Sequence, residues 1–212
     1  MKVLFGCVLA VAIATAETRS VCAEAYSPAA VPLVTRSEKL EKFLADYAKA
    51  PGAKALALTS DRKSVYGYWR QSSIEDATRR TLQICEWRSK APCALYAVGD
   101  EVQPKKNGDW GATPAIKYGP WNFRPADAYD VPFLTEESQK KLMGVAAQSA
   151  SSSSFIVITP AGQYWFWVSG VTRNSGAGEE LLEKCLATLG ERGKEDCIVF
   201  SRRSQVVLEK PQ

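Results

Sequence analysis

The chain has 212 residues, of which 46% are hydrophobic and 24% are charged, and this composition is typical of folded proteins rather than disordered ones. Its formal net charge is +4, from 27 basic and 23 acidic residues that are mixed along the chain, so we expect no nucleic-acid binding. It contains no histidine, which excludes Ser-His-Asp and Cys-His catalysis, histidine-ligated zinc and a histidine general base.

The first 25 residues have the pattern of a secretory signal peptide. Lys2 precedes an apolar stretch over residues 3–14, and small-residue sequences of the A-x-A type end at Ala16 and Ala25. The stretch is shorter than the roughly 20 residues of a membrane-spanning helix, and no later stretch approaches that length. We therefore expect a periplasmic or secreted protein with no integral membrane segment in the mature chain. The alternative is an amino-terminal anchor that is never cleaved.

The cysteines help to choose the cleavage site. Cleavage after Ala25 removes Cys7 and Cys22 and leaves four of the six cysteines. Cleavage after Ala16 would leave Cys22 as an odd thiol in an oxidising compartment, which is disfavoured. We expect cleavage after Ala25, although cleavage after Ala23 leaves the same even number.

The two halves of the chain match one another at a shift of 100 positions. The matches are Val-Pro-Leu-Val-Thr at 31–35 with Val-Pro-Phe-Leu-Thr at 131–135, Leu-Ala-Leu-Thr at 56–59 with Ile-Val-Ile-Thr at 156–159, Ala77 with Ala177, Leu82 with Leu182, and Cys85 with Cys185. After a four-residue insertion, Cys93 matches Cys197. Chance can supply one such match but not the ordered set, so the sequence predicts a duplication. Repeat 1 covers 31–102, an inter-repeat excursion covers 103–130, and repeat 2 covers 131–207.

Each copy is predicted to contain the same five elements. A helix follows the Val-Pro pair, with Thr35 and Glu38 spaced as a capping box in copy one. A hairpin, a second helix and a last strand follow. The predicted strands are Ala55–Thr59, Val65–Trp69 and Ala94–Val98 in copy one, and Phe155–Thr159, Tyr164–Val168 and Ile198–Ser201 in copy two. The sequence therefore predicts an α+β fold of two α-β-β-α-β repeats, each a small mixed sheet covered by helices and held by one disulfide.

The excursion over 103–130 shows no regular period and contains four prolines and three glycines. We expect an irregular connection anchored by Trp110, Trp121 and Phe123. Connections of this length without secondary structure are usually functional or partly disordered.

The four remaining cysteines favour disulfides over a metal site. Seven residues separate Cys85 from Cys93 and eleven separate Cys185 from Cys197, whereas zinc-ligand pairs are separated by about two to four. The alternative, an all-thiolate zinc site, is opposed by an oxidising compartment. Because the duplication preserves the pair in each copy, we expect Cys85–Cys93 and Cys185–Cys197, each stabilising by about 2.5 kcal/mol. We expect no metal and no cofactor.

Several motifs of copy one carry a resemblance to a known kind of domain. They are Lys-Ala-Leu-Ala-Leu at 54–58, Tyr-Gly-Tyr-Trp at 66–69, Cys85, and Cys-Ala-Leu-Tyr-Ala-Val at 93–98. Copy two keeps the cysteines but has a looser Cys-Ile-Val-Phe at 197–200. This pattern resembles an uncharacterised domain that recurs, often in tandem, in secreted or periplasmic proteins of alphaproteobacteria. The resemblance covers most of 31–207 and implies the compartment and the fold class, with no known activity.

Carboxylates are the acid–base groups that a chain without histidine could use. They include Asp61, Glu75, Asp76, Glu86, Asp100 and Glu101. Two carboxylates about 5–9 Å apart can cleave glycosides, but no sequence feature selects a pair. We therefore predict no catalytic residue, and a carboxylate-dependent hydrolase acting on cell-wall polysaccharide is the alternative function.

The aromatic strands are the strongest candidates for binding. Tyr-Trp-Phe-Trp at 164–167 places large rings on both faces of one strand, and alternation assigns Trp165 and Trp167 to the same face. If this strand binds a partner, we expect the tryptophan face to be the exposed one, because indole offers the largest stacking surface. The favoured interpretation is that both faces are buried, one by helices and the other by the 103–130 excursion or by the other copy. The predicted binding residues are Trp165, Trp167, Trp69, Tyr164 and Tyr66. The expected function is non-enzymatic binding of an envelope protein or a glycan.

Overall fold

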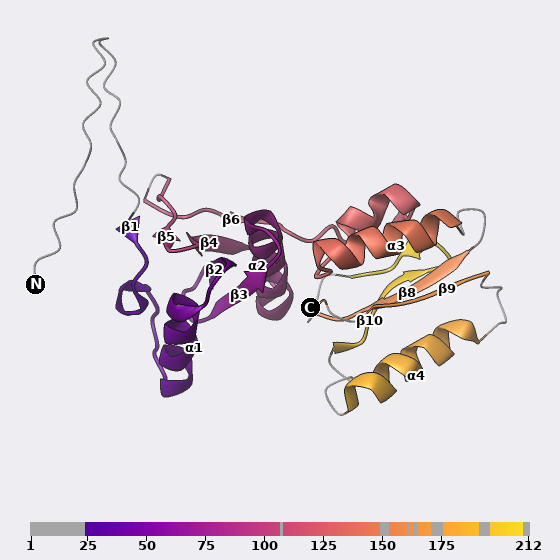
Figure 1. The fold of residues 1–212 in the computed structure, drawn as a ribbon, viewed down its shortest axis with the longest axis horizontal. Coiled ribbons are helices and arrows are strands. Elements are labelled where there is room, and N and C mark those ends of the chain that lie inside the picture. Colours follow the sequence, from indigo (N-terminus) through magenta and orange to yellow (C-terminus); the bar gives the residue numbers. More distant parts are fainter. Residues whose placement is uncertain are drawn as a thin grey trace, which may run out of the picture.

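The computed structural model of the chain describes residues 24–106, 108–148, 153–160, 162, 165–170, 176–190 and 196–209. This part of the chain forms two antiparallel sheets with helices on their faces, one sheet in each half (Figure 1). No helix within these ranges is long and apolar enough to cross a membrane.

The first unit, residues 24–113, is built on a six-stranded sheet. Its elements are β1 (Glu24–Ala25), the 3-10 helix η1 (Pro28–Ala30), α1 (Glu38–Lys49), β2 (Ala53–Thr59), β3 (Val65–Gln71), α2 (Ile74–Ser89), β4 (Cys93–Val98), β5 (Glu101–Val102) and β6 (Ala112–Thr113). The strands lie in the order β1-β5-β4-β2-β3, with β6 beside β4, and all neighbouring strands are antiparallel.

The second unit, residues 121–209, is built on a five-stranded sheet. Its elements are β7 (Trp121–Asn122), the 3-10 helix η2 (Pro125–Asp130), α3 (Glu136–Gln148), β8 (Ser154–Ile158), β9 (Trp165–Ser169), α4 (Ala177–Leu189), β10 (Ile198–Arg202) and β11 (Gln205–Val206). The strand order is β7-β11-β10-β8-β9, again antiparallel throughout the described strands.

The two units share one topology. The eight elements from β1 to β5 recur in the same order from β7 to β11. Ala55 pairs with Tyr68, and 100 positions later Phe155 pairs with Val168. The predicted α+β fold of two similar units is therefore confirmed. The described sheets are antiparallel rather than mixed, because β2 and β3 form a hairpin and α2 returns the chain as β4, which runs opposite to β2.

The second unit begins earlier in the chain than its sequence pattern indicates. Residues 121–130, expected within an irregular connection, form β7 and η2, which correspond to β1 and η1 of the first unit. Glu24 and Ala25, expected at the end of a signal peptide, form β1 and pair with Val102 and Glu101. Two-residue strands carry no period, so only their partners in the sheet reveal them. The rest of the predicted signal peptide, residues 1–23, lies outside the described residues.

The first helix of each unit starts at a different cap. In the first unit the cap is Ser37, whose hydroxyl accepts a hydrogen bond from the Leu40 amide, so the predicted capping box at Thr35 is wrong. The Arg36 guanidinium donates to the Val31 carbonyl at 2.7 Å, and Ser37 itself is extended, so the helix begins two residues later than predicted. In the second unit the Thr135 hydroxyl caps α3.

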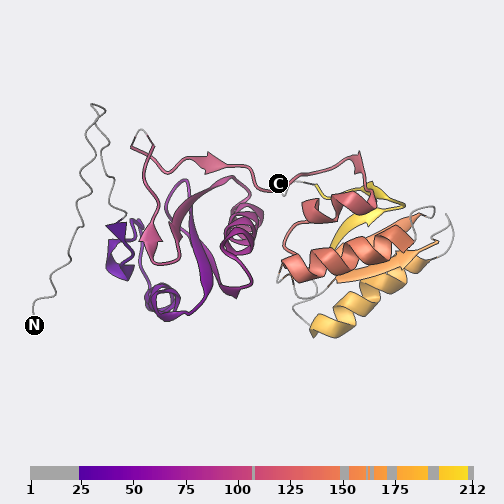
Figure 2. The ribbon, with the colours of Figure 1, turned by 45° about the horizontal axis from the view of Figure 1, so that its top comes forward.

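Helices cover both faces of each sheet (Figures 1 and 2). Leu44 of α1 belongs to the same buried cluster as Leu56 and Leu58 of β2. Cys85 of α2 packs with Ala57 on the opposite face of that strand. Because β2 is buried on both sides, its sequence is a nearly continuous apolar run rather than an alternating one.

The two disulfides are the ones that the sequence predicts. Cys85 is bonded to Cys93, and Cys185 to Cys197, with a Cα–Cα distance of 6.1 Å in each pair. Each bond joins the second helix of a unit to the strand that follows it, so the duplication preserves both the bond and its place in the fold.

Two glycines provide a matched test of this packing. Gly162 has φ +69°, and an added Cβ would lie 2.0 Å from the Phe133 carbonyl oxygen, whereas a Cβ on Gly144 in α3 would meet nothing within 4 Å. Gly162→Ala should cost more than about 1 kcal/mol, because a left-handed conformation alone costs that much. Gly144→Ala should stabilise by about 0.5–1 kcal/mol. Chemical denaturation measures both, and a fully stable Gly162→Ala variant would contradict the contact with Phe133.

Candidate functional site

The predicted binding aromatics lie on two separate edge strands. Tyr66 and Trp69 belong to β3, at one edge of the first sheet, and Trp165 and Trp167 belong to β9, at one edge of the second. Tyr164 lies outside the described residues. The structure therefore does not gather the candidates into one aromatic surface.

The tryptophan face of β9 is not the exposed face that binding by this strand would need, so the binding hypothesis for this strand is wrong. Trp165 and Trp167 are partly buried against the larger core of the second unit, and the rings of Trp167 and Phe123 are 6.4 Å apart. Phe166 packs on the opposite face, against the cluster that contains Leu181 of α4. Both faces of β9 are thus covered, and the segment that packs over the tryptophan side, residues 121–130, belongs to the predicted excursion.

The two aromatics of β3 also face opposite sides of their sheet. Tyr66 packs on the side of α2, against the cluster that contains Cys85. Trp69 packs on the side of α1, with its ring 5.3 Å from Phe43 and 6.4 Å from Tyr47. Trp69 differs from the other described candidates because it also borders a pocket with unpaired charges.

The Trp69 pocket has a volume of about 270 Å³ and lies between the end of α1 and the end of β3. Asp46, Lys49, Ala50 and Arg70 complete its lining. The Asp46, Lys49 and Arg70 side chains are exposed, and no hydrogen bond or ion pair joins them to another residue of the described ranges. One indole, one carboxylate and two cations thus line the same pocket, and the three charged groups are free to bind a ligand.

The second unit shows that the fold does not require these residues. Register places Ser169 and Gly170 where the first unit has Trp69 and Arg70. At the 100-position shift, Ala146 matches Asp46 and Ser149 matches Lys49, so the second copy has neither charge. Since the second unit builds the same elements without this set, the pocket side chains are free for a role other than folding.

Arg70 adopts a backbone conformation that disfavours its side chain. Its φ is +59°, in the left-handed region, and Gly170 occupies the corresponding position with φ +73°. A residue other than glycine costs roughly 1–2 kcal/mol there. Strain of this kind is concentrated at functional sites, so an exposed arginine at this position points to a use for its guanidinium.

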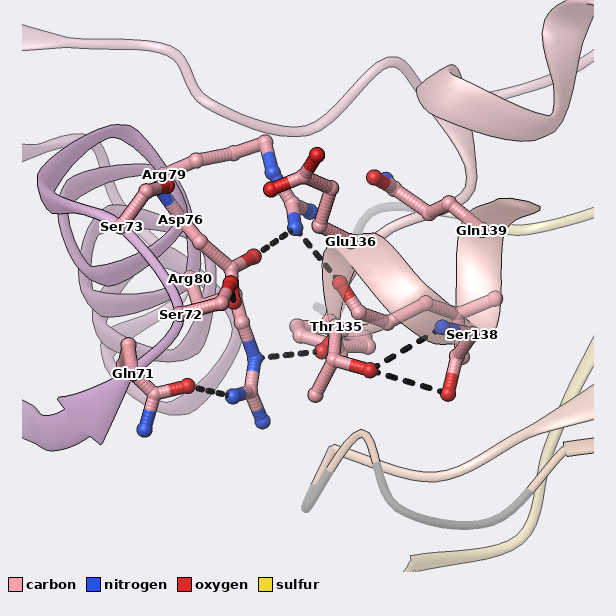
Figure 3. A network of polar contacts seen from close by, with 12 residues as sticks. Gln71, Ser72, Ser73, Asp76, Arg79, Arg80, Thr135, Glu136, Ser138 and Gln139 are labelled. Carbon is pink, nitrogen blue, oxygen red and sulfur yellow. Dashed lines mark hydrogen bonds and ion pairs between the residues drawn. The ribbon is translucent and has the colours of Figure 1, made fainter. Parts of the chain in front are cut away.

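A second polar cluster joins the two units, and it is centred on Arg80 of α2 (Figure 3). Arg80 is only 3% exposed. Its Nε donates to the Phe133 carbonyl at 2.8 Å, its guanidinium also donates to the Gln71 side chain, and it lies 4.3 Å from the centroid of the Tyr68 ring. Arg80 therefore links β3 of the first unit with the segment between η2 and α3 of the second.

Other side chains of α2 also form hydrogen bonds with main-chain groups outside the helix. Arg79 donates to the Asp76 carboxylate and to the Leu134 carbonyl, at 2.5 Å each, and burial lowers the pKa of its guanidinium. The Gln83 side-chain oxygen accepts from the Phe133 amide at 2.9 Å. The buried Glu86 carboxylate accepts from the Ala115 and Ile116 amides, at 2.5 and 3.3 Å. The polar side of α2 thus holds main-chain groups on both sides of β7.

The carboxylates considered for hydrolysis have structural partners instead. A pocket of about 270 Å³ at the junction is lined partly by Glu75, Asp76 and Glu136. Asp76 is paired with Arg79, and the hydrogen bond from Lys140 lowers the pKa of Glu136. A glycosidase acid needs a raised pKa, which is the opposite direction.

Three other carboxylates considered for hydrolysis, Asp61, Asp100 and Glu101, do not line this pocket. Asp100 is ion-paired with Lys54 at 2.7 Å, and the Thr59 hydroxyl lowers the pKa of Asp61 by hydrogen bonding. Glu101 lies exposed in β5. Within the described ranges, no cluster of cysteine and carboxylate side chains is arranged to hold a metal ion.

Sequence reasoning missed Asp46, Lys49 and Arg70, because isolated charges on a helix or at a strand end are usually solvated. A signal was present in the duplication, since Arg70 aligns with Gly170 at a turn position where glycine is preferred. It also missed the hydrogen bonds from the polar side chains of α2 to main-chain groups. Main-chain partners leave no pattern of side chains in the sequence.

Comparison with known proteins finds no matching family model, no matching curated protein and no matching solved structure. The resemblance to a tandem domain of secreted proteins therefore stays a prediction. The second unit of the chain therefore serves as the comparison for the first, and it lacks the charged residues that line the Trp69 pocket.

Replacing Arg80 tests the junction. Arg80→Met should lower the free energy of unfolding by about 2–3 kcal/mol, because it leaves the buried Phe133 carbonyl without its donor. Arg88→Met is the matched control, since the Arg88–Asp196 ion pair is partly exposed and should contribute less than about 1 kcal/mol. Denaturant titration compares the two variants, and equal losses would contradict a central role for Arg80.

Proposed function

We propose that the protein is a non-enzymatic binding protein of the cell envelope and that its Trp69 pocket holds a saccharide unit of a glycan. The observation that carries the proposal is a partly buried indole that borders a pocket together with unpaired charged side chains. The second unit folds without this combination, so a purely structural origin does not account for it.

The pocket chemistry suits a sugar. An aromatic face can stack against the apolar face of a sugar ring. The Asp46 carboxylate can accept hydrogen bonds from hydroxyl groups, and the Lys49 and Arg70 side chains can donate them. The volume of about 270 Å³ lies just below the range of roughly 300–1,000 Å³ for sites that enclose drug-sized ligands, which favours one sugar unit.

A folded protein partner fits the pocket less well. Protein interfaces generally centre on apolar or aromatic surface that is free before binding. The exposed large apolar residues of the described chain are Val34, Ile74 and Tyr129, and none of them lines the pocket. These observations favour a glycan over a protein.

We also propose that the protein acts in the periplasm or outside the cell. Two disulfides support an oxidising compartment, and the amino-terminal sequence supports export. Cleavage after Ala25 would remove Glu24 and Ala25, which form β1, so the fold favours cleavage after Ala23.

Sequencing of the mature amino terminus tests this boundary. The chain purified from the periplasm or the culture medium should begin at Glu24, because β1 is then retained. A mature chain that begins at Tyr26 would show that β1 is dispensable, and a protein that keeps its first 23 residues would contradict export by cleavage.

Variants of the pocket test the binding proposal against a panel of purified envelope polysaccharides and isolated cell-wall sacculi. Trp69→Ala should abolish binding, and Asp46→Ala should weaken it about tenfold, which corresponds to about 1.4 kcal/mol. Asp46 is exposed and unpaired, so its variant should keep the melting temperature of the parent protein. Glu38→Ala, an exposed carboxylate on the same helix, is the matched control and should bind normally.

Co-sedimentation and the change in tryptophan fluorescence measure binding. Failure of every glycan to bind, or normal binding by Asp46→Ala, would contradict the proposal. Release of soluble sugars from the sacculi would favour the alternative hydrolase.

A further inference from the structure

We infer that the Trp69 pocket selects acidic saccharides, in which a carboxylate or phosphate group is bound by Arg70 and Lys49 while the sugar ring stacks on Trp69. This inference rests on the proposed saccharide binding and adds the charge of the ligand to it.

The charge of the pocket is the first argument. Lys49 and Arg70 contribute two positive charges and Asp46 contributes one negative charge, so the lining is cationic by one unit. These groups form no ion pairs with other described residues, so their charge is not already neutralised by the protein. A cationic surface of this kind attracts an anionic ligand and leaves one carboxylate to bind hydroxyl groups.

The convergence of the two cations is the second argument. Lys49 lies in the last turn of α1 and Arg70 near the end of β3, so the fold brings together two residues separated by 20 others. A guanidinium forms paired hydrogen bonds with a carboxylate or a phosphate, whereas an ammonium acts as a point charge. The two types together suit one anionic group.

The left-handed backbone conformation of Arg70 also supports a role in binding. A Cβ added to Gly52 would lie 3.8 Å from the Arg70 Cα, so the turn between α1 and β2 lies close to the backbone of Arg70. Lys49 is accounted for partly by the dipole at the end of α1, where a cation is favourable. Arg70 has no comparable structural role, since it is exposed, unpaired and in a conformation for which the second unit uses Gly170.

Arg70→Gly separates ligand recognition from folding. Because it installs the residue that the second unit uses, the variant should have an unchanged or higher melting temperature. Two pairs of probes compare a sugar that carries an anionic group with a neutral analogue: trigalacturonic acid with its methyl ester, and glucose 1-phosphate with methyl glucoside. In at least one pair, the parent protein should bind the acidic member at least about tenfold more tightly than the neutral one, and added salt should reduce the difference.

Arg70→Gly should remove the preference for the acidic member, and Arg70→Lys should restore part of it. Lys42→Ala, which removes a cation of α1 outside the pocket, is the matched control and should keep the preference. The pair that shows the preference distinguishes a carboxylate ligand from a phosphate ligand.

The outcomes separate this inference from the proposed function. Equal binding of acidic and neutral members would overturn the acidic preference and leave saccharide binding standing. If neither the probes nor the panel of envelope glycans binds, the proposed function fails as well. A lower melting temperature of Arg70→Gly would assign Arg70 a structural role and overturn its place in recognition.

Discussion

The arrangement of the two units depends on one buried cation. Arg80 is almost fully buried on α2, and its guanidinium donates to the Phe133 carbonyl at the entry to the second unit. A buried charge is costly unless its hydrogen bonds are made, so the chain must keep the Phe133 backbone where Arg80 can reach it. Phe133 accordingly adopts φ +68°, and Gly162 leaves room for the contact because it has no Cβ. Three segments distant in sequence, which contain Arg80, Phe133 and Gly162, are thus constrained by one side chain.

The two units share a topology but differ in the residues that make contacts outside it. In α2, positions 79 and 80 are arginines that donate to main-chain carbonyls, whereas the corresponding positions of α4 are Glu179 and Glu180. Ionised carboxylates cannot donate hydrogen bonds to carbonyl groups, so Glu179 and Glu180 cannot form the hydrogen bonds that Arg79 and Arg80 form in α2. The two units differ likewise at the end of β3, where Arg70 stands at the position that corresponds to Gly170.

Stability and recognition are therefore divided between different parts of the repeat. The disulfides, the buried strands β2 and β8 and the helices packed on them recur in both units and hold the fold together. The Trp69 pocket belongs to the first unit alone and carries a strained arginine and uncompensated charges, which a site selected only for stability would avoid. Replacement of such residues can change binding while leaving the common fold intact.

The sequence by itself determined the features that are local or repeated: the duplication, the order of helices and strands, and the pairing of Cys85 with Cys93 in one copy as in the other. These are encoded by periodicity and spacing, which do not depend on the rest of the chain. Only the tertiary structure decided which faces are covered. Trp167 is partly buried because Phe123, between β7 and η2, packs near its ring, and Trp69 borders a charged pocket because α1 ends beside β3. Burial and proximity depend on contacts between segments distant in sequence, and no local pattern records them.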